Sequence, residues 1–565
     1  MEINGFHISN RPTRWVERSV NGISWKVRSD FLLPLIHNVA PRLSKGVIIE
    51  TPLRENAFRI VFRLQIPNPD KLSGQNLVVK EYRWPTWKNR LKYLFRRSKG
   101  HREWERTEEA RARGIPVPEI LALGEKRRLG LLQKNFLITK ELENTQTLGE
   151  FLFEQLPHLE VEERERLLKR AVPVFAKFVA RLHARGLAHR DFHPGNVLVS
   201  WKETIPSFYL LDLDQARIGR SLSPRARVRN LVRLNRSFWT SSLATRARFL
   251  RAYLKEIPQL SAKRKKFARQ IERQTESSVR SFYRRRDRRC MTSNKYFDVR
   301  SLGGIRWHIL REFETEDLLD VLARPENALE RGSVLKWGNT NQVVELALKR
   351  NSAKTVLKRM VISPQKKHAF WKKFPGRCKA VRVWRLANAF LSRNLPTPKP
   401  VAEGCLRRLG FFSRSYFITE KIPKSRHLGE WLASEPAPGP KQELTRRLAR
   451  LFARVHKMGF DHRDLKVQNF LVQEMPKSPP SIYCLDFEGV RFRRRVPLAR
   501  VIQNLSRLNA SVTLKGLVTR TDRLRFLKAY MGRLSSDRKL VRRIWQLTHK
   551  RTRQKLLAAL KKARY

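Results

Sequence analysis

The spacing of apolar residues in the N-terminal half predicts a few short strands and then helices. Apolar residues alternate or cluster over Arg59–Gln65, Leu77–Tyr82 and Phe136–Thr139, which is typical of strands. A helix should end before the turn that contains Pro116. Over Val174–His183 the apolar positions recur at helical spacing, which predicts an amphipathic helix. The pattern therefore predicts a small strand-rich lobe followed by a mainly helical lobe.

The C-terminal half repeats this pattern in the same order. Strands are predicted at Gln342–Leu348, Val356–Met360 and Tyr416–Thr419, and an amphipathic helix at Leu448–His456. Matched residues keep one order along the chain: Trp25 with Trp307, His189 with His462, and Tyr253 with Tyr530. The repetition predicts an α+β fold of two tandem domains, residues 1–280 and 281–565.

The boundary is placed near a basic run, Tyr283–Arg289, which interrupts the apolar pattern. This run is interpreted either as a linker or as a basic strap at the start of the second domain. Each of the two copies has about the length of a single compact domain.

Two matched loops carry the strongest chemical signal. His189-Arg190-Asp191 is followed by Asn196, and His462-Arg463-Asp464 is followed by Asn469. This spacing is the catalytic-loop pattern of protein-kinase-like folds. There, the Asp accepts or orients the proton of an acceptor hydroxyl, and the Asn offers an amide oxygen to Mg²⁺. A loop Asp that caps a helix is the alternative, but two complete sets in matching order favour the catalytic interpretation.

The other expected groups lie on strands. Asp212 and Asp486 end apolar strands, and each is expected to be the second ligand of Mg²⁺. Lys80 and Lys358 close short strands and suit contacts to the nucleotide phosphates, although a lysine at a strand end is also common on a solvated surface.

The partner of that lysine differs between the copies. Glu103 lies on the helix that precedes Gly114 and is expected to hold Lys80 in an ion pair. The corresponding segment Gln365–Ala402 contains no Asp or Glu. The second copy is therefore expected to be slow or inactive, unless a glutamate from elsewhere substitutes.

Two further features are less distinctive. Glycine is scarce where a loop over phosphates is expected, with only Gly338 in the second copy and none over Glu50–Asn56 in the first. His183 and His456 end their helices, and we expect them to pack or hydrogen-bond there rather than to act in catalysis. A zinc site of His183, His189 and His193 is not expected, because His193 has no counterpart in the second copy.

The net charge, the hydrophobic share and the cysteine count each limit what kind of protein this is and what it binds. The 565 residues include 120 Lys+Arg and 50 Asp+Glu, a formal net charge of +70, so acidic partners are expected: nucleic acid, an anionic membrane or a phosphorylated substrate. The hydrophobic share of 41% excludes wholesale disorder. Neither a spanning helix nor a signal peptide is expected. The four cysteines are widely spaced, so neither a disulfide framework nor a cysteine zinc site is expected, and a reducing cytosol fits.

Basic and aromatic residues are mixed in two segments, Trp84–Arg97 and Lys366–Phe374. Such a mixture suits an anionic bilayer surface, with rings among the headgroups and cations over phosphate. The equally weighted alternative is that the rings pack inside the fold while the cations face water. A third segment, Arg542–Arg564, is rich in Lys and Arg around Leu556, Leu557 and Leu560, and it either binds such a surface likewise or simply completes the fold.

At these residues the chain resembles the lipopolysaccharide core kinases, bacterial enzymes that phosphorylate Kdo or heptose. The features that carry the resemblance are the VVK at Lys80, the REW at Glu103, GIPVP, HRDFH with Asn196, LDLD, and their counterparts in the second copy. The resemblance implies a protein-kinase-like fold in tandem and the use of Mg-ATP. It also implies residue roles: Asp191 and Asp464 as catalytic bases, Asn196, Asp212, Asn469 and Asp486 as metal ligands, and Lys80 and Lys358 as ATP contacts. An adenine hinge is implied near Lys140–Leu142 and Glu420–Ile422.

The resemblance implies phosphoryl transfer to a sugar hydroxyl of a glycolipid, by a cytoplasmic protein at the inner face of the cytoplasmic membrane. One alternative is a Ser/Thr protein kinase, since HRDLK at His462 fits that class, but neither copy has an APE motif or a long activation segment. The other alternative is a non-catalytic scaffold that binds an anionic membrane or RNA; nucleic acid is possible but not favoured.

Overall fold

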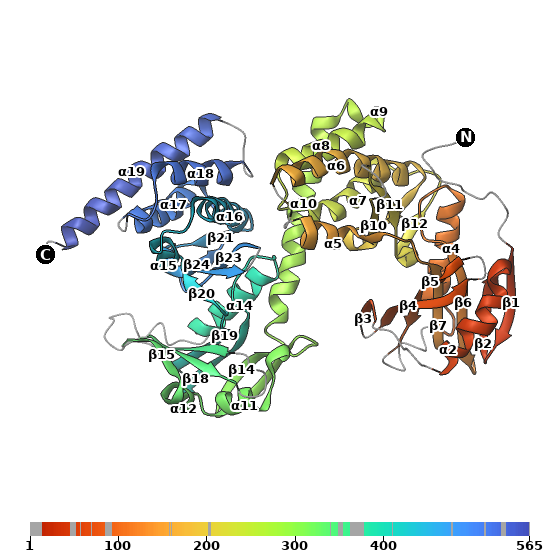
Figure 1. Cartoon of the computed structure of the whole chain (residues 1–565), viewed down its shortest axis with the longest axis horizontal. Coiled ribbons are helices and arrows are strands. Elements are labelled where there is room, and N and C mark those ends of the chain that lie inside the picture. The colour runs from red at the N-terminus through yellow and green to blue at the C-terminus, as the bar shows by residue number, and fades with distance from the viewer. Residues whose placement is uncertain are drawn as a thin grey trace. The chain divides into compact units, whose positions relative to one another are not determined.

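The computed structural model describes residues 14–563, apart from 46–51, 57, 69–70, 85–92, 157–158, 160, 202–204, 339–340, 349–353, 362–377, 409–410, 476–477, 514–515 and 533–537. The chain separates into two compact units, here called the first unit (Met1–Trp239 with Ala244–Glu276) and the second unit (Thr240–Leu243 with Ser277–Tyr565). Within each unit, Figure 1 shows one lobe built around a sheet and one dominated by helices.

The sheet of the first unit has seven antiparallel strands in the order β1-β2-β6-β7-β5-β4-β3. The strands are β1 (Trp15–Val20), β2 (Ile23–Arg28), β3 (Arg54–Asn56), β4 (Arg59–Asn68), β5 (Lys71–Tyr82), β6 (Ile120–Arg128) and β7 (Leu131–Lys140). Asn21 and Gly22 both take positive φ between β1 and β2, as a two-residue hairpin turn requires. The short helices α1 (Leu32–Pro34) and α2 (Ala40–Lys45) follow this hairpin, and α4 (Lys99–Ala112) packs on β6 and β7.

Helices dominate the other lobe of the first unit. They are α5 (Leu148–Glu150), α6 (Val161–Ala184), α7 (Pro224–Ser237), α8 (Leu243–Lys255), α9 (Pro258–Ser261) and the first half of α10 (Arg264–Arg289), a helix that continues from Ser277 in the second unit. Two small sheets, β11-β10-β8 and β12-β9, carry the loops with the predicted site residues. Their strands are β8 (Thr145–Thr147), β9 (Leu187–His189), β10 (Val197–Ser200), β11 (Ser207–Leu210) and β12 (Ala216–Ile218).

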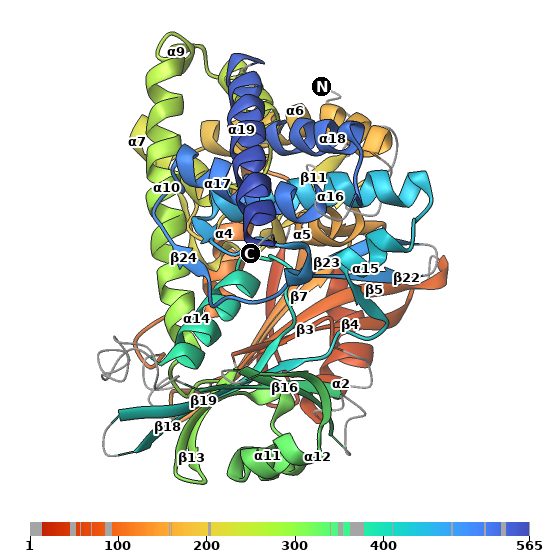
Figure 2. The same cartoon turned by 90° about the vertical axis from the view of Figure 1, so that its left-hand side faces the viewer.

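The second unit repeats this topology, with the sheet order β13-β14-β18-β19-β17-β16-β15. The strands are β13 (Phe297–Leu302), β14 (Ile305–Leu310), β15 (Ser333–Trp337), β16 (Asn341–Ala347), β17 (Lys354–Val361), β18 (Pro400–Arg408) and β19 (Phe411–Glu420). Figure 2 shows α11 (Glu316–Ala323) and α12 (Pro325–Arg331) along the outer face of this sheet, with α14 (Lys379–Leu391) toward the helical lobe.

The helical lobe of the second unit matches that of the first. Its helices are α15 (Leu428–Ala433), α16 (Pro438–Lys457), α17 (Leu498–Thr513), α18 (Arg520–Met531) and α19 (Arg538–Ala563). Its small sheets are β20-β22-β23 and β21-β24, formed by β20 (Ser425–His427), β21 (Phe460–His462), β22 (Phe470–Met475), β23 (Ser478–Cys484) and β24 (Val490–Phe492).

A matched tryptophan–glycine pair explains one of the repeated motifs. Trp25 on β2 is fully buried opposite Gly124 on β6, and Trp307 on β14 is fully buried opposite Gly404 on β18. A Cβ atom added to Gly124 would lie 2.5 Å from the Trp25 ring, and one added to Gly404 would lie 2.6 Å from the Trp307 ring. Only glycine leaves room for the indole at these positions.

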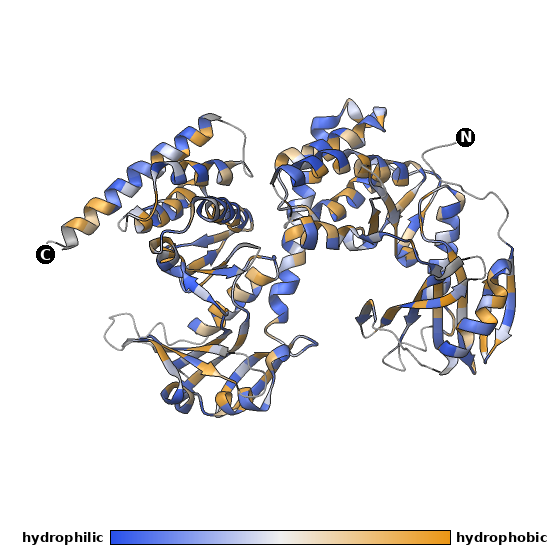
Figure 3. Ribbon diagram, viewed as in Figure 1, coloured by the Kyte–Doolittle hydropathy of each residue, from blue (hydrophilic) through white to orange (hydrophobic). Residues whose placement is uncertain are grey.

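The predicted strands and helices and the α+β class are confirmed, and hydrophobic and hydrophilic positions alternate along them as expected (Figure 3). The run Tyr283–Arg289 lies inside α10, in the second unit, and its interpretation as a linker or as a basic strap stays a prediction. Within that unit, Asp287 receives two hydrogen bonds from Arg393, at 2.7 and 2.9 Å. The domain boundary at 280/281 stays a proposal.

Two further expectations concern cysteines and membranes. No disulfide was expected, yet Cys378 and Cys405 are joined as one, because α14 and β18 bring these distant positions together. Among the described residues, no helix combines the length and the hydropathy needed to cross a bilayer.

Candidate active site

A buried carboxylate joins the sheet of the first unit to α4. Val79 faces the apolar core of the sheet, so strand alternation turns the neighbouring Lys80 to the opposite face. There the Lys80 ammonium and the Tyr82 hydroxyl both donate to Glu103, which lies on the buried side of α4 and is only 3% exposed. Burial, and then the Glu103 charge, raise the pKa of Tyr82 well above its usual value, so the hydroxyl stays a donor. The predicted Lys80–Glu103 pair is therefore present.

His189 ties the HRD loop to the strand that follows it. Its Nε2 lies 3.1 Å from the Leu211 carbonyl and 2.9 Å from the Asp212 carbonyl, while its Nδ1 accepts the Asp191 N–H at 3.2 Å. This arrangement requires the neutral tautomer with the proton on Nε2, and burial lowers the pKa of His189 accordingly. Its own carbonyl accepts from the Asn230 amide at 2.6 Å. The histidine thus positions the residues on both sides of the site.

Asp212 holds a backbone conformation that is rare for a residue with a Cβ. Its φ is 63° and its ψ 56°, in the left-handed region, and Asp486 repeats this with φ 55°. Arg59 donates to the Asp212 carboxylate at 2.9 Å. Burial alone would raise the pKa of Asp212, but the charges of Lys80 and Arg59 outweigh it and hold that pKa below its ordinary value. Asp212 is therefore ionised and lies close enough to Lys80 to feel its charge.

Asp191 is the most exposed member of the set. Its side chain is 60% exposed and lies 3.4 Å from His193 Nε2. The hydrogen bond from His193 lowers the pKa of Asp191, so the carboxylate is ionised and free to accept from a hydroxyl. Asn196 donates its amide N–H to the Asp191 carbonyl at 3.0 Å, which leaves the amide oxygen as the remaining polar atom of that side chain.

Asn196 and Asp212 are a suitable oxygen pair for Mg²⁺. The Leu211 N–H donates to the Asn196 carbonyl at 2.9 Å, which keeps the two residues on adjoining segments. A carboxylate and an amide oxygen are the ligand types that Mg²⁺ prefers, and their chemistry fits that ion. Their roles as metal ligands, and that of Asp191 as base, stay predictions.

The second unit keeps the loop and changes the polar groups above it. Asn469 donates to the Asp464 carbonyl at 2.6 Å, and His462 lies 3.4 Å from the Leu485 carbonyl. Lys358, however, forms its ion pair with Glu488, a side chain that lies two residues after Asp486. A glutamate from elsewhere therefore does substitute, as the sequence analysis allowed.

The positions around Lys358 explain why. Strand register and helix alignment place Asn341, Met360 and Val383 where the first unit has Arg59, Tyr82 and Glu103. Val383 is buried and carries no charge, so α14 offers nothing to the lysine. Asp464 in turn lies 2.9 Å from Lys466.

The histidines at the helix ends, His183 and His456, are buried and hydrogen-bonded, as expected. His183 bonds to the Tyr253 hydroxyl at 2.8 Å and to Asn230 at 2.9 Å, and His456 bonds to the Tyr530 hydroxyl at 2.8 Å. Burial lowers the pKa of His183 and of His456 to about 4. They are structural groups of the two helical lobes.

Several predicted features lie partly or wholly outside the described residues. These are Glu50–Thr51 of the segment Glu50–Asn56, Asn339–Thr340 after Gly338, the part of Trp84–Arg97 from Pro85 to Lys92, the whole of Lys366–Phe374, and Arg564. Of the first basic and aromatic segment, Trp84 and Tyr93 are buried and their rings meet edge to face at 5.6 Å. These two rings pack inside the fold, whereas Phe95 is 96% exposed.

Sequence reasoning missed the contacts of Arg59, Tyr82 and Glu488, and it considered His193 only as a zinc ligand, which it rejected. Only Glu488 left a usable signal, because both copies carry an acid two residues after the expected metal ligand, Asp214 in one and Glu488 in the other. Asp214 is also unusual, since burial and then the charges of Asp212 and Glu103 raise its pKa to about 6.

Comparisons with known proteins show the family of the chain. The model of the lipopolysaccharide kinase (Kdo/WaaP) family matches residues 65–253 and again residues 332–530, once in each unit. A 3-deoxy-D-manno-octulosonic acid kinase of Xanthomonas campestris pv. campestris (strain B100) is 32% identical over 149 residues, which cover 26% of this chain and 55% of that enzyme. The enzyme of that name from Actinobacillus succinogenes is 29% identical over 185 residues, covering 32% and 72%.

The chain thus spans about half the length of the Xanthomonas relative. Among solved structures, WaaP in complex with acyl carrier protein shares 20% sequence identity, covering 40% of this chain and 92% of that one, with a TM-score of 0.31. A TM-score this low carries no argument. The two separate family matches confirm the predicted tandem kinase-like arrangement.

Proposed function

The chain belongs to the lipopolysaccharide kinase (Kdo/WaaP) family, and we propose that its first unit transfers the γ-phosphoryl group of ATP to a sugar hydroxyl of a lipopolysaccharide-like glycolipid. The acceptor sugar is of the Kdo or heptose type. The protein works in the cytoplasm, at the inner face of the cytoplasmic membrane.

The observation that carries this proposal is the buried Glu103 beneath Lys80, beside the ionised Asp212. Burying the charged Glu103 side chain, which is only 3% exposed, costs free energy unless it is paired. Here Glu103 is paired with Lys80 and fixes that lysine beside Asp212, the proposed metal ligand. In kinase-like folds this lysine holds the α- and β-phosphates of ATP, and its glutamate partner must be in place for transfer.

Each residue then has a defined task. Lys80 binds and orients the phosphates, Asn196 and Asp212 hold Mg²⁺, and Asp191 accepts a hydrogen bond from the attacking hydroxyl and takes up its proton. Mg²⁺, when bound, neutralises charge that develops on the phosphate oxygens. Arg59, which binds Asp212 in the structure, must share or yield that carboxylate when the metal binds.

We further propose that the second unit does not transfer phosphate. Its lysine does have a glutamate partner, but Glu488 comes from the segment that should bind metal, and no acid of α14 holds the lysine from the helix as Glu103 does in the first unit. The second unit instead helps to hold the acceptor or the membrane surface.

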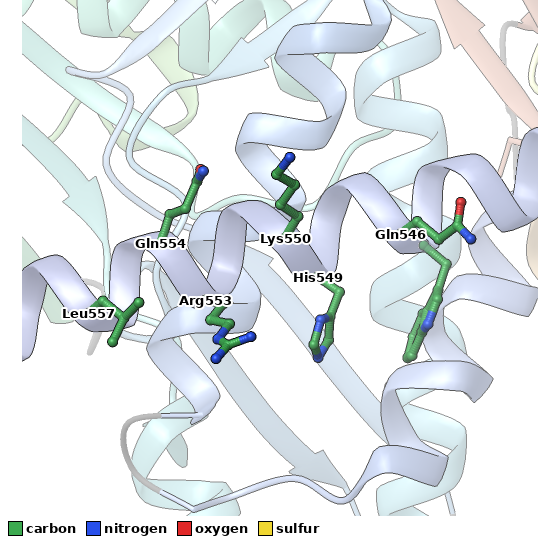
Figure 4. A pocket seen from close by; sticks show the side chains of 7 residues that line it. Gln546, His549, Lys550, Arg553, Gln554 and Leu557 are labelled. Atoms are coloured by element: carbon green, nitrogen blue, oxygen red, sulfur yellow. The ribbon is translucent and has the colours of Figure 1, made fainter.

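The proposed membrane contact includes the end of α19. Ile544 and Thr552 of this helix are buried, so one side completes the fold. Figure 4 shows a pocket on α19 lined by Trp545, Gln546, His549, Lys550, Arg553, Gln554 and Leu557, none of which is a predicted site residue. Leu557 and Leu560 are more than half exposed among lysines and arginines, which suits an anionic lipid surface.

The test is incubation of the purified chain with γ-labelled ATP, Mg²⁺ and membranes that contain truncated lipopolysaccharide, followed by separation of lipid from protein. Label in the glycolipid that depends on Mg²⁺ supports the proposal. Label only in protein would support a Ser/Thr protein kinase instead. No nucleotide binding, together with salt-sensitive binding to RNA or anionic vesicles, would support a non-catalytic scaffold.

A further inference from the structure

A cluster of metal-binding side chains lies in the second unit, away from its HRD loop. Cys378 precedes the first turn of α14, and Glu403 and Cys405 lie on β18, which packs against that helix (Figure 2). One Sγ atom from each cysteine and one carboxylate oxygen of Glu403 all lie within 4.8 Å of one another. The two sulfurs are bonded to each other in the structure, so they would have to be reduced and move apart for both to bind a cation beside Glu403.

The chemistry of Glu403 is the reason to look for a cation. This glutamate is 1% exposed, and its Oε1 accepts from His308 Nδ1. Its Oε2 faces Cys405 Sγ at 3.9 Å. In the disulfide form neither sulfur carries a hydrogen, so this buried oxygen has nothing to accept from Cys405. Among the described residues this oxygen then has no hydrogen-bond donor, which is costly for a buried carboxylate, whereas a bound cation would satisfy it together with both sulfurs.

The first unit shows that the fold does not need this cluster. Strand register places Lys26 opposite Leu123 where the second unit has His308 opposite Glu403. Ser98 takes the place of Cys378 and caps α4 in the ordinary way, accepting from the His101 N–H at 3.0 Å. At four matched positions the first unit thus has Ser98, Lys26, Leu123 and Glu125 where the second unit has Cys378, His308, Glu403 and Cys405.

The cluster lies between α14 and the sheet, where the second unit lacks the tie that Glu103 provides between α4 and the sheet in the first unit. In the first unit, Glu103 binds Lys80 and Tyr82 and thereby ties α4 to the sheet. Val383 cannot do this for α14. We propose that the reduced side chains of Cys378, Glu403 and Cys405 bind one thiolate-preferring divalent cation, Zn²⁺, which ties the start of α14 to β18. His308 orients the Glu403 carboxylate, and water completes the tetrahedron.

Zinc binding and the disulfide exclude each other, because a disulfide sulfur is not a thiolate ligand. Binding releases the thiol protons of Cys378 and Cys405, and no electron transfer is involved. Oxidation of the pair by a thiol oxidant such as a disulfide would release the ion. The proposal does not depend on the activity of the first unit.

The experiment measures zinc bound to the full chain, expressed with added Zn²⁺ and purified under a phosphine reductant. Inductively coupled plasma mass spectrometry should find about one zinc per chain in the wild type. Cys484→Ala, which removes a buried free cysteine elsewhere in the second unit, should retain it. Cys378→Ser and Glu403→Gln should each lower the bound zinc at least tenfold.

A second measurement guards against variants that fail to fold. Co²⁺ added to the metal-free wild type should give the intense visible and near-ultraviolet absorption of tetrahedral thiolate coordination, and the circular dichroism spectrum shows whether each variant is folded. A wild type without zinc whose Cys378 and Cys405 resist alkylation as a disulfide would overturn the proposal. Zinc retained in a folded Cys378→Ser variant would overturn it equally.

Discussion

Lys358 of the second unit is paired with Glu488, a side chain that comes from the metal-ligand segment rather than from the neighbouring helix. In the first unit the matching lysine is paired with Glu103 of α4, and the residue that corresponds to Glu488 is Asp214. The two pairs also differ in environment, since the side chain of Glu103 is 3% exposed and that of Glu488 is 25% exposed. The two units therefore place the glutamate partner of the matched lysine on different elements: on α4 in the first unit, and after the expected metal ligand Asp486 in the second.

This difference predicts unequal effects of matched substitutions. Glu103→Gln should lower phosphoryl transfer about 10²-fold, because Lys80 loses the charge that fixes it toward the phosphates. Glu488→Gln should leave transfer within about twofold of the wild type. Initial rates with labelled ATP at saturating Mg²⁺ check both; equal losses in the two variants would contradict the assignment of chemistry to the first unit.

Arg59 should affect the metal requirement. Its hydrogen bond occupies one oxygen of Asp212, so Arg59→Asn, which copies Asn341 of the second unit, should lower the Mg²⁺ concentration for half-maximal transfer about three- to tenfold. A titration with Mg²⁺ at fixed ATP measures this. A Gln342→Ala variant serves as a control on the matching strand, and an unchanged or higher Mg²⁺ requirement for Arg59→Asn would show that Arg59 does not compete with the ion.

The buried histidines predict loss of stability in mild acid. The pKa of His183 and of His456 is lowered to about 4 in the folded chain, against about 6.5 in an unfolded one. Between these values the unfolded state binds more protons, so stability falls as the pH falls from about 6.5 toward about 4. The full effect is about 3 kcal/mol for each histidine.

Urea unfolding at pH 7.5 and at pH 5 tests this dependence. In His183→Gln the first unit should lose less stability between the two pH values than it does in the wild type, although its stability at pH 7.5 is lower. His456→Gln should behave likewise in the second unit. The same pH dependence in both variants and in the wild type would place its origin elsewhere.

Much of this arrangement could be predicted from the sequence, because it is encoded locally. The HRD loops, the strand-end aspartates and the pairing of Lys80 with Glu103 follow from spacing along short segments, and the tandem repeat follows from matched order. The repeat of Trp25 and Gly124 as Trp307 and Gly404 has a physical reason, since each indole needs the space that its glycine leaves.

The parts that could not be predicted depend on contacts between distant segments. Arg59 reaches Asp212 across 153 positions, and Glu488 reaches Lys358 across 130. Cys378 and Cys405 meet only because α14 packs on β18. The helix over Tyr283–Arg289 was not predicted for a different reason, since a run of arginines shows no helical spacing of apolar residues. In the structure, Asp287 of this run forms an ion pair with Arg393.

The most direct measurement compares Asp191→Asn with Asp464→Asn in Mg²⁺-dependent transfer from labelled ATP to membrane glycolipid. Both substitutions remove one carboxylate charge from matched loops and keep the shape of the side chain. The account predicts that Asp191→Asn lowers transfer at least about 10²-fold, whereas Asp464→Asn stays within about twofold of the wild type. Full activity in Asp191→Asn, with activity lost in Asp464→Asn, would contradict it.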